Sequence, residues 1–256
     1  MLPISKLLSV ICITTVLFSC TSKKDILYFQ NQDKLNFEES VRIDQKIIID
    51  DILSVKIHSL DLESSEPYNL KSSTTSNNLS TDMLKLEGYL VGNEGAITLP
   101  VLGITTVTDK STEELEDFLT AKLINEGHLK NPTVVVRVIN SKITILGEVK
   151  SPGTFNFTEK NLTLLQAIGL AGDLTINGKR NDVMLIRQED NIKKIIHIDL
   201  TSTNWFNTPY YFIKQNDVLV VNPNNAKVKS AGIIGNTNTL ISLLSIILTS
   251  VVLITK

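Results

Sequence analysis

The chain has 256 residues, a formal net charge of -2 and a hydrophobic content of 42%. This length leaves room for one large domain or two small ones, and the composition is ordinary for a folded protein. The slightly negative charge argues against nucleic acid as a partner, because nucleic-acid-binding proteins need a basic face. With 5 Tyr, 8 Phe and 1 Trp, we do not expect a broad aromatic platform for stacking sugars or bases.

Cysteine and histidine are scarce and widely spaced. Both cysteines, Cys12 and Cys20, fall in the first twenty residues, so the mature chain is expected to have no internal disulfide. His58, His128 and His197 are too far apart to show the spacing of metal ligands. We therefore predict no metal site and no cofactor.

The first twenty residues read as a secretion signal. Lys6 supplies a short positive region, and residues 7–18 form an apolar run of the length typical of a signal peptide. The run ends at Leu17-Phe18-Ser19-Cys20, which resembles a bacterial lipobox, although Phe18 is bulkier than usual. We expect residues 1–19 to be removed and Cys20 to be acylated. The alternative is an ordinary secretory signal or an N-terminal anchor with an incidental cysteine.

Residues 20–45 are polar and are interpreted as an acylated tether, followed by a first α+β unit over residues 46–140. It opens with one or two strands broken at Asp50-Asp51, and these two carboxylates are expected in a turn or a solvated loop. Residues 92–95 form a turn between two short strands. Ser111 and Glu114 predict a capping box at the start of a helix, and residues 133–139 predict a strand.

A second α+β unit is predicted over residues 141–225. A tight turn at residues 151–153 joins two strands, and a short helix follows that Thr163 and Gln166 can cap. Further strands are expected over residues 183–187, 192–200 and 218–221. This order of hairpin, helix and strands resembles a β-grasp fold.

No catalytic constellation is found in either unit. Gly169, Gly172 and Gly178 lack the G-x-G-x-x-G spacing, and no Walker motif exists. The chain also has no G-x-S-x-G nucleophile motif and no Cys–His pair. We therefore predict no catalytic residues.

Residues 226–256 are expected to contain a C-terminal membrane helix. On a helix, Asn238, Ser242, Ser245 and Thr249 fall on one stripe, because they are separated by four, three and four positions. The opposite surface is apolar and is expected to face lipid. Its residues are Leu240, Leu243, Leu244, Ile247 and Val251. Twenty residues rise about 30 Å, so this helix is expected to just cross a membrane.

Three interpretations of the polar stripe remain open. A single-pass tail anchor tolerates hydroxyl groups that bond back to the preceding turn. Small and hydroxyl residues also line ordinary helix–helix contacts in lipid. In the third interpretation, copies of the helix form an oligomeric α-barrel with the stripe facing a pore. About eight helices with axes about 8–10 Å apart leave a lumen wide enough for a hydrated sugar chain.

Two longer stretches carry a family resemblance. Residues 88–123 resemble the core of outer-membrane polysaccharide export proteins, the Wza-like family. Residues 143–187, with Leu-Gly-Glu-Val, Pro-Gly, Leu-Leu-Gln-Ala-Ile and Ala-Gly in order, resemble an SLBB (soluble-ligand-binding β-grasp) domain. In departure from the family, Ile48-Ile49-Asp50-Asp51 replaces a Gly-Pro-Gly-Asp-like turn, and there is room for only one β-grasp repeat.

The resemblance implies an α+β protein: a small export domain, one SLBB domain and a C-terminal transmembrane helix that forms an oligomeric α-barrel. It implies a homo-oligomeric ring of about eight subunits, a polysaccharide substrate and an inner-membrane co-polymerase, often a tyrosine autokinase, as partner. The protein is expected at the outer membrane, lipid-anchored and mostly periplasmic, with its C-terminus at the cell surface.

We therefore predict a passive conduit that exports capsular polysaccharide or exopolysaccharide without catalysis. The alternative is a periplasmic lipoprotein that binds glycan or acts as an assembly scaffold, in which the C-terminal helix is a simple membrane tail. An enzyme acting on polysaccharide is disfavoured, because no paired acid and base motif is present.

Overall fold

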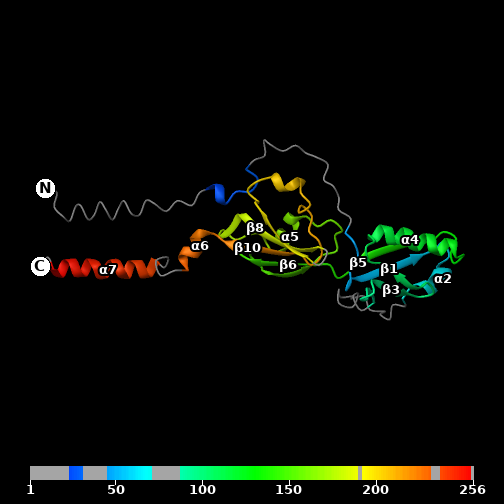
Figure 1. Ribbon diagram of the computed structural model, residues 1–256. Coiled ribbons are helices and arrows are strands. Elements are labelled where there is room, and N and C mark those ends of the chain that lie inside the picture. The colour runs from blue at the N-terminus through cyan, green and yellow to red at the C-terminus, as the bar shows by residue number, and fades with distance from the viewer. Residues whose placement is uncertain (1–22, 31–44, 71–86, 190–191, 232–236, 255–256) are drawn as a thin grey trace.

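The computed structural model describes residues 23–30, 45–70, 87–189, 192–231 and 237–254. Figure 1 shows two folded units along one axis, with the C-terminal helices at the end opposite the first unit. The predicted signal peptide and Cys20 lie outside the described residues.

The first unit is built on a three-stranded antiparallel sheet in the order β2-β1-β5. The strands are β1 (Ile52–His58), β2 (Tyr89–Leu90) and β5 (Thr133–Val138). Along β1, Leu53, Val55 and Ile57 are buried, while the side chains between them are more exposed. This alternation places one face of the strand in the core. Next to the sheet lie the hairpin strands β3 (Ala96–Leu99) and β4 (Gly103–Thr106), and the short helices α2 (Leu62–Ser65) and η3 (Glu66–Tyr68).

Helix α4 (Thr112–Asn125) packs against β5 and begins at the predicted capping box. The Ser111 hydroxyl accepts from the Glu114 N–H, and the Glu114 carboxylate accepts from the Ser111 N–H at 2.7 Å. Two of the otherwise unpaired N-terminal donors are thereby satisfied. The buried stripe of the helix consists of Leu115, Leu119 and Leu123. Burying each of these side chains contributes about 1.5–3 kcal/mol.

The second unit has a five-stranded sheet in the order β7-β6-β10-β8-β9. The strands are β6 (Lys142–Gly147), β7 (Gly153–Asn156), β8 (Gly178–Glu189), β9 (Ile192–Ile198) and β10 (Val218–Pro223). β6 and β10 are parallel, and the other pairs are antiparallel. Helix α5 (Leu164–Leu170) begins at Thr163, and Gln166 completes the predicted capping box. The loop before β10 contains the short helix η4 (Asn204–Asn207).

Gly147 explains part of the Leu-Gly-Glu-Val pattern. Its φ is +89°, and a Cβ atom at this position would collide with the carbonyl oxygen of Val221 on β10. Only glycine allows this close approach of two parallel strands without strain. The close approach of β6 and β10 therefore requires a glycine at this position.

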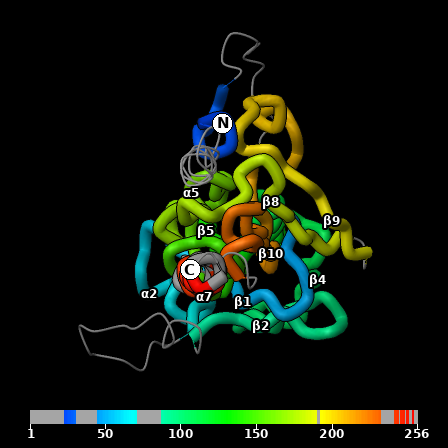
Figure 2. The backbone as a smooth tube through the Cα atoms, turned by 90° about the vertical axis from the view of Figure 1, so that its left-hand side faces the viewer, coloured from blue at the N-terminus to red at the C-terminus, as the bar shows by residue number. Residues whose placement is uncertain are grey.

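Beyond the second unit lie α6 (Asn225–Ser230) and α7 (Thr237–Ile254), and Figure 2 shows α7 end-on. The prediction of a helix near the C-terminus is confirmed. Among the described residues, however, none of the helices combines the length and the apolar character that a membrane crossing needs. A membrane crossing by this helix therefore stays a prediction.

Candidate functional site

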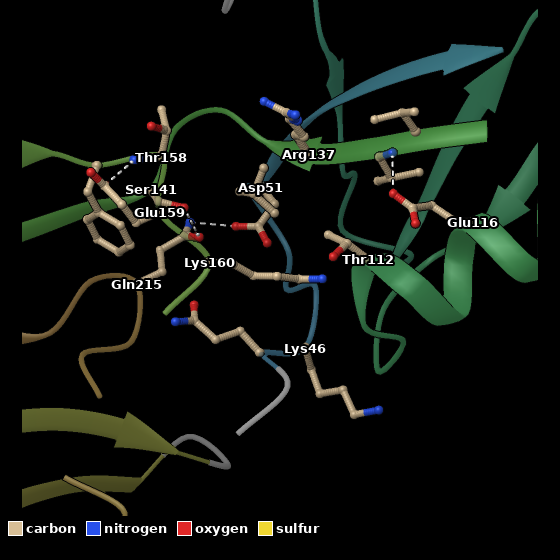
Figure 3. A pocket seen from close by; sticks show the side chains of 15 residues that line it. Lys46, Asp51, Thr112, Glu116, Arg137, Ser141, Thr158, Glu159, Lys160 and Gln215 are labelled. Carbon is tan, nitrogen blue, oxygen red and sulfur yellow. Dashed lines mark hydrogen bonds between the residues drawn. The ribbon is translucent and has the colours of Figure 1, made fainter. Parts of the chain in front are cut away.

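A cleft of about 430 Å³ lies between the two units and is lined by residues of both. Figure 3 shows it from close by, with side chains that come from β5, α4, the chain before β1, the segment after β7 and the loop before β10. Its charged lining residues are Lys46, Arg137, Lys160, Asp51, Glu116 and Glu159. The cleft thus combines equal numbers of cationic and anionic side chains.

Asp51 is the buried carboxylate of this cleft, with 1% of its surface exposed. Its Oδ1 accepts from Gln215 Nε2 at 2.5 Å and its Oδ2 accepts from the Ile48 N–H at 3.0 Å. Burial raises the pKa of Asp51 to about 6, and these two hydrogen bonds oppose the rise. The expected turn is present, since the Asp51 N–H donates to the carbonyl of Ile48 at 3.2 Å, but Asp51 is buried rather than solvated and Gln215 of the second unit lies against it.

Two further contacts join the two units near the cleft, and a third holds the connection between them. Lys160 of the second unit forms an ion pair with Glu113 at the start of α4. Gln45 Nε2 donates to the carbonyl of Ile213 at 2.9 Å. The Ser141 hydroxyl, in the short connection between the units, donates to Gln215 at 3.4 Å. The partners in these contacts are 47, 168 and 74 positions apart in the chain.

The segment just after the predicted lipobox lies on the second unit. Residues 23–30, which include the short helix η1 (Lys23–Asp25), make two backbone hydrogen bonds to residues 200–201. The Tyr28 hydroxyl donates to Asp173 at 2.6 Å, and the Arg180 guanidinium lies 5.3 Å from the Tyr28 ring centroid. Burial, helped by Asp173, raises the pKa of Tyr28 above its usual range. This segment, expected to be a tether, is therefore held on the second unit through residues 28–30.

A buried ion pair holds the loop before β10. The Arg187 guanidinium donates to both carboxylate oxygens of Asp217, at 3.0 and 2.7 Å, and each side chain is 1% exposed. Arg187 also donates to the carbonyls of Pro209 and Phe212. The planar guanidinium group of Arg187 thus pairs with the buried carboxylate and holds the loop before β10 in place.

The same loop brings aromatic side chains together with the N-terminal segment. Phe29 contacts Phe206 edge-to-face at 5.4 Å between centroids, and Trp205 contacts Phe206 at 4.8 Å. The connected rings are Tyr28, Phe29, Trp205, Phe206, Tyr211 and Phe212. Composition did not predict this cluster, because its members come from segments about 175 residues apart. Four of these six ring pairs are edge-to-face and two are tilted, so the rings pack against one another in the fold.

Helix α7 contains the residues of the predicted polar stripe, which are Asn238, Ser242, Ser245 and Thr249. The Ser245 hydroxyl donates to the carbonyl of Ile241 at 2.8 Å, and the Thr249 hydroxyl donates to Ser245 at 2.7 Å. Their protons are therefore used within the helix, and their oxygens remain available as acceptors. Nearby apolar side chains of the same helix are exposed. They are Ile241, Leu243, Ile246, Ile247 and Leu253.

Titratable groups elsewhere serve local structure. His128 contacts Tyr68 and Glu126, and His197 contacts Asp182. Across the described ranges, no three His, Cys, Asp or Glu side chains are grouped so that they could hold a metal ion.

Comparison with known families gives two consecutive matches. Residues 39–139 match the family "Polysaccharide biosynthesis/export protein", and residues 142–195 match the SLBB domain. The cleft lies where these two matches meet.

Individual relatives are similar over one part of their length. The EPS I polysaccharide export outer membrane protein EpsA of Ralstonia nicotianae is 30% identical over 106 residues, which is 40% of this chain and 27% of the relative. The EpsA protein of Ralstonia solanacearum is 32% identical over 92 residues, 35% of this chain and 24% of the relative. The exopolysaccharide production protein ExoF of Rhizobium meliloti is 31% identical over 96 residues, 36% of this chain and 23% of the relative. The similar region thus spans about a quarter of each of these relatives.

Proposed function

We propose that this chain, which belongs to the Wza-like polysaccharide export family and carries an SLBB domain, is an outer-membrane component that exports capsular polysaccharide or exopolysaccharide. The observation that carries the proposal is the order of the two matches, with the export match at residues 39–139 directly before the SLBB match at 142–195. Relatives named for export or production of exopolysaccharide favour a transport role over catalysis.

In this proposal the chain is divided into an acylated tether, two folded units and a C-terminal helix. The ranges are 20–45 for the tether, 46–140 for the export domain, 141–225 for the SLBB domain and 226–256 for the C-terminal part. Acyl chains on Cys20 anchor the protein in the outer membrane. Since residues 23–30 lie on the second unit, the lipid anchor would hold that unit close to the inner leaflet.

The proposed active form is a homo-oligomeric ring of about eight copies, by analogy with the family, in which the α7 helices pack side by side with axes about 8–10 Å apart. Asn238, Ser242, Ser245 and Thr249 face the axis of this ring. Since Ser245 and Thr249 donate to their own helix, they offer a passing polymer weak, replaceable acceptor contacts. The outer side, proposed to contact lipid, consists of Leu240, Leu243, Leu244, Ile247 and Val251.

The conduit is proposed to be passive. No residue of the chain is assigned to catalysis, so the force on the polymer comes from its synthesis or from an inner-membrane co-polymerase. Family resemblance suggests a tyrosine autokinase in that role.

The second candidate is a glycan-binding or scaffold lipoprotein with a simple helical tail. The hydroxyls of Ser245 and Thr249 bond back to the preceding turn, which is also typical of an isolated helix in an apolar setting. In this case the protein would act as a monomer or a dimer.

Two experiments separate the candidates. Deletion of the gene should abolish surface polysaccharide while its lipid-linked precursor remains, and the detergent-solubilised protein should have the native mass of a large ring. Ser245→Asp on the axial stripe should preserve export, whereas Ile247→Asp on the apolar side should abolish it. A monomeric or dimeric native mass, or equal loss of export in both variants, would favour the scaffold.

A further inference from the structure

The cleft between the export domain and the SLBB domain has the form of a binding site. Its volume of about 430 Å³ lies within the range of roughly 300–1,000 Å³ found for small-molecule sites. Figure 3 shows Lys160 reaching from the second unit towards Thr112 and Asp51 of the first. A ligand here would contact both units at once.

The charges of the cleft disfavour an anionic ligand such as phosphate. Lys46 already binds Glu114 at 2.7 Å, and Lys160 already binds Glu113. An anion would have to compete with these carboxylates for both lysines. It would also approach Glu116 and the other acidic side chains of the lining. A neutral ligand meets neither obstacle.

The edge of β5 disfavours an extended peptide. This strand pairs with β1 on one side only, so its other edge borders the cleft. At the middle of that edge, the Val136 N–H donates to Glu116 Oε1 at 2.8 Å. A peptide that added a strand here would have to displace the Glu116 carboxylate from this bond.

Several polar groups of the cleft retain hydrogen-bonding capacity. Within the described residues, the exposed Arg137 guanidinium forms no hydrogen bond or ion pair. Glu116 uses one carboxylate oxygen for Val136 and keeps the other. Glu159 likewise uses Oε2 for the Thr158 N–H. Strong donors and strong acceptors therefore stand together around one cavity.

We propose that this cleft binds a neutral sugar segment of the exported polysaccharide. Each sugar hydroxyl both donates and accepts, so it matches a cavity where Arg137 donates and where Glu116 and Glu159 accept. Val135 and Val138, which also line the cleft and are only partly buried, supply apolar surface for the C–H groups of a sugar ring. The assignment rests on the proposed export function for the identity of the polymer.

Titration calorimetry of the full-length protein in detergent tests the proposal. The probe is a set of short neutral oligosaccharides, obtained by partial hydrolysis of the polysaccharide that the producing cell secretes. Arg137→Gln should weaken binding ten-fold or more, because it removes charged donors that have no partner in the protein. Lys56→Gln, on the neighbouring strand β1 and outside the lining, is the matched control and should leave binding unchanged.

A second measurement does not depend on a variant. Saturating oligosaccharide should slow chemical acetylation of Lys160 in the cleft, with Lys56 in the same digest as the internal reference. The assignment would be overturned by any of three outcomes: absence of binding, equal weakening in both variants, or displacement of the sugar by inorganic phosphate.

The outcome can be separated from that of the export proposal. If gene deletion blocks export but the protein binds no oligosaccharide, the cleft assignment fails and the export function stands. If the protein binds the oligosaccharide through Arg137 but deletion leaves export intact, the cleft assignment stands and the export function fails.

Discussion

Asp51 allows a quantitative test of the contact between the two units. Desolvation raises its pKa from 3.8 to about 6 in the folded protein, so the folded state holds the proton more tightly than the unfolded state does. The free energy of unfolding therefore falls as the pH rises from about 4 through about 6. The difference of about 2 pH units corresponds to about 3 kcal/mol, all of which is lost above pH 6.

The substitution Asp51→Asn removes this dependence, because asparagine is neutral at every pH. Asparagine has one acceptor oxygen in place of two, so one of the hydrogen bonds from Ile48 or Gln215 is lost at about 1 kcal/mol. We expect the variant to be about 2 kcal/mol more stable than wild type at pH 7.5 and about 1 kcal/mol less stable at pH 4.

Urea denaturation followed by circular dichroism across this pH range measures the effect. Asp50→Asn, at the exposed neighbouring position, is the control; it removes only the smallest of the effects on the pKa of Asp51 and should keep most of the wild-type slope. If the curves of Asp51→Asn and wild type run parallel from pH 4 to 7.5, the carboxylate is not desolvated by the second unit and the reasoning fails.

Three further predictions concern stability. Arg187→Met should destabilise the protein by about 3–5 kcal/mol, because the buried carboxylate of Asp217 loses its partner, and the double variant with Asp217→Leu should recover most of this loss in urea denaturation. Tyr28→Ala should release the N-terminal segment and speed tryptic cleavage after Lys23, whereas unchanged digestion would contradict its docking. Leu119→Ala should cost about 2–5 kcal/mol, measured in the same denaturation assay, since this side chain is fully buried on the inner face of α4.

Much of the local structure could be predicted from the sequence. The capping boxes at Ser111 and Thr163, and the helices that follow them, are confirmed because capping depends on residues only three positions apart. The strands of both units also follow from patterns of apolar residues, although β8 extends well beyond the predicted residues 183–187. Of its additional residues, Gly178 pairs with β10, and Gln188 and Glu189 pair with β9, which no local pattern reveals.

The cleft could not be predicted in the same way. Asp51 next to Asp50 is a common turn pattern, and nothing nearby in the chain indicates that Gln215 covers one of them. From the sequence, Glu116 is expected to be an exposed residue of a helix, yet its carboxylate accepts a hydrogen bond from the Val136 N–H at the edge of β5. The signal that could have been used is the position of Asp51 directly before a buried strand, where a carboxylate is often held by backbone N–H groups.

By itself, the sequence determined the order of the two α+β units, the capped helices and the glycine positions, because these depend on neighbours within a few residues. It also predicted the resemblance to the export family and to the SLBB domain, since the matching motifs are read along the chain. Only the tertiary structure decided which charges are buried, how residues 23–30 dock, and that a polar cleft separates the units. Those features depend on contacts between residues tens to hundreds of positions apart, and the free energy of burying a charge is set by what covers it.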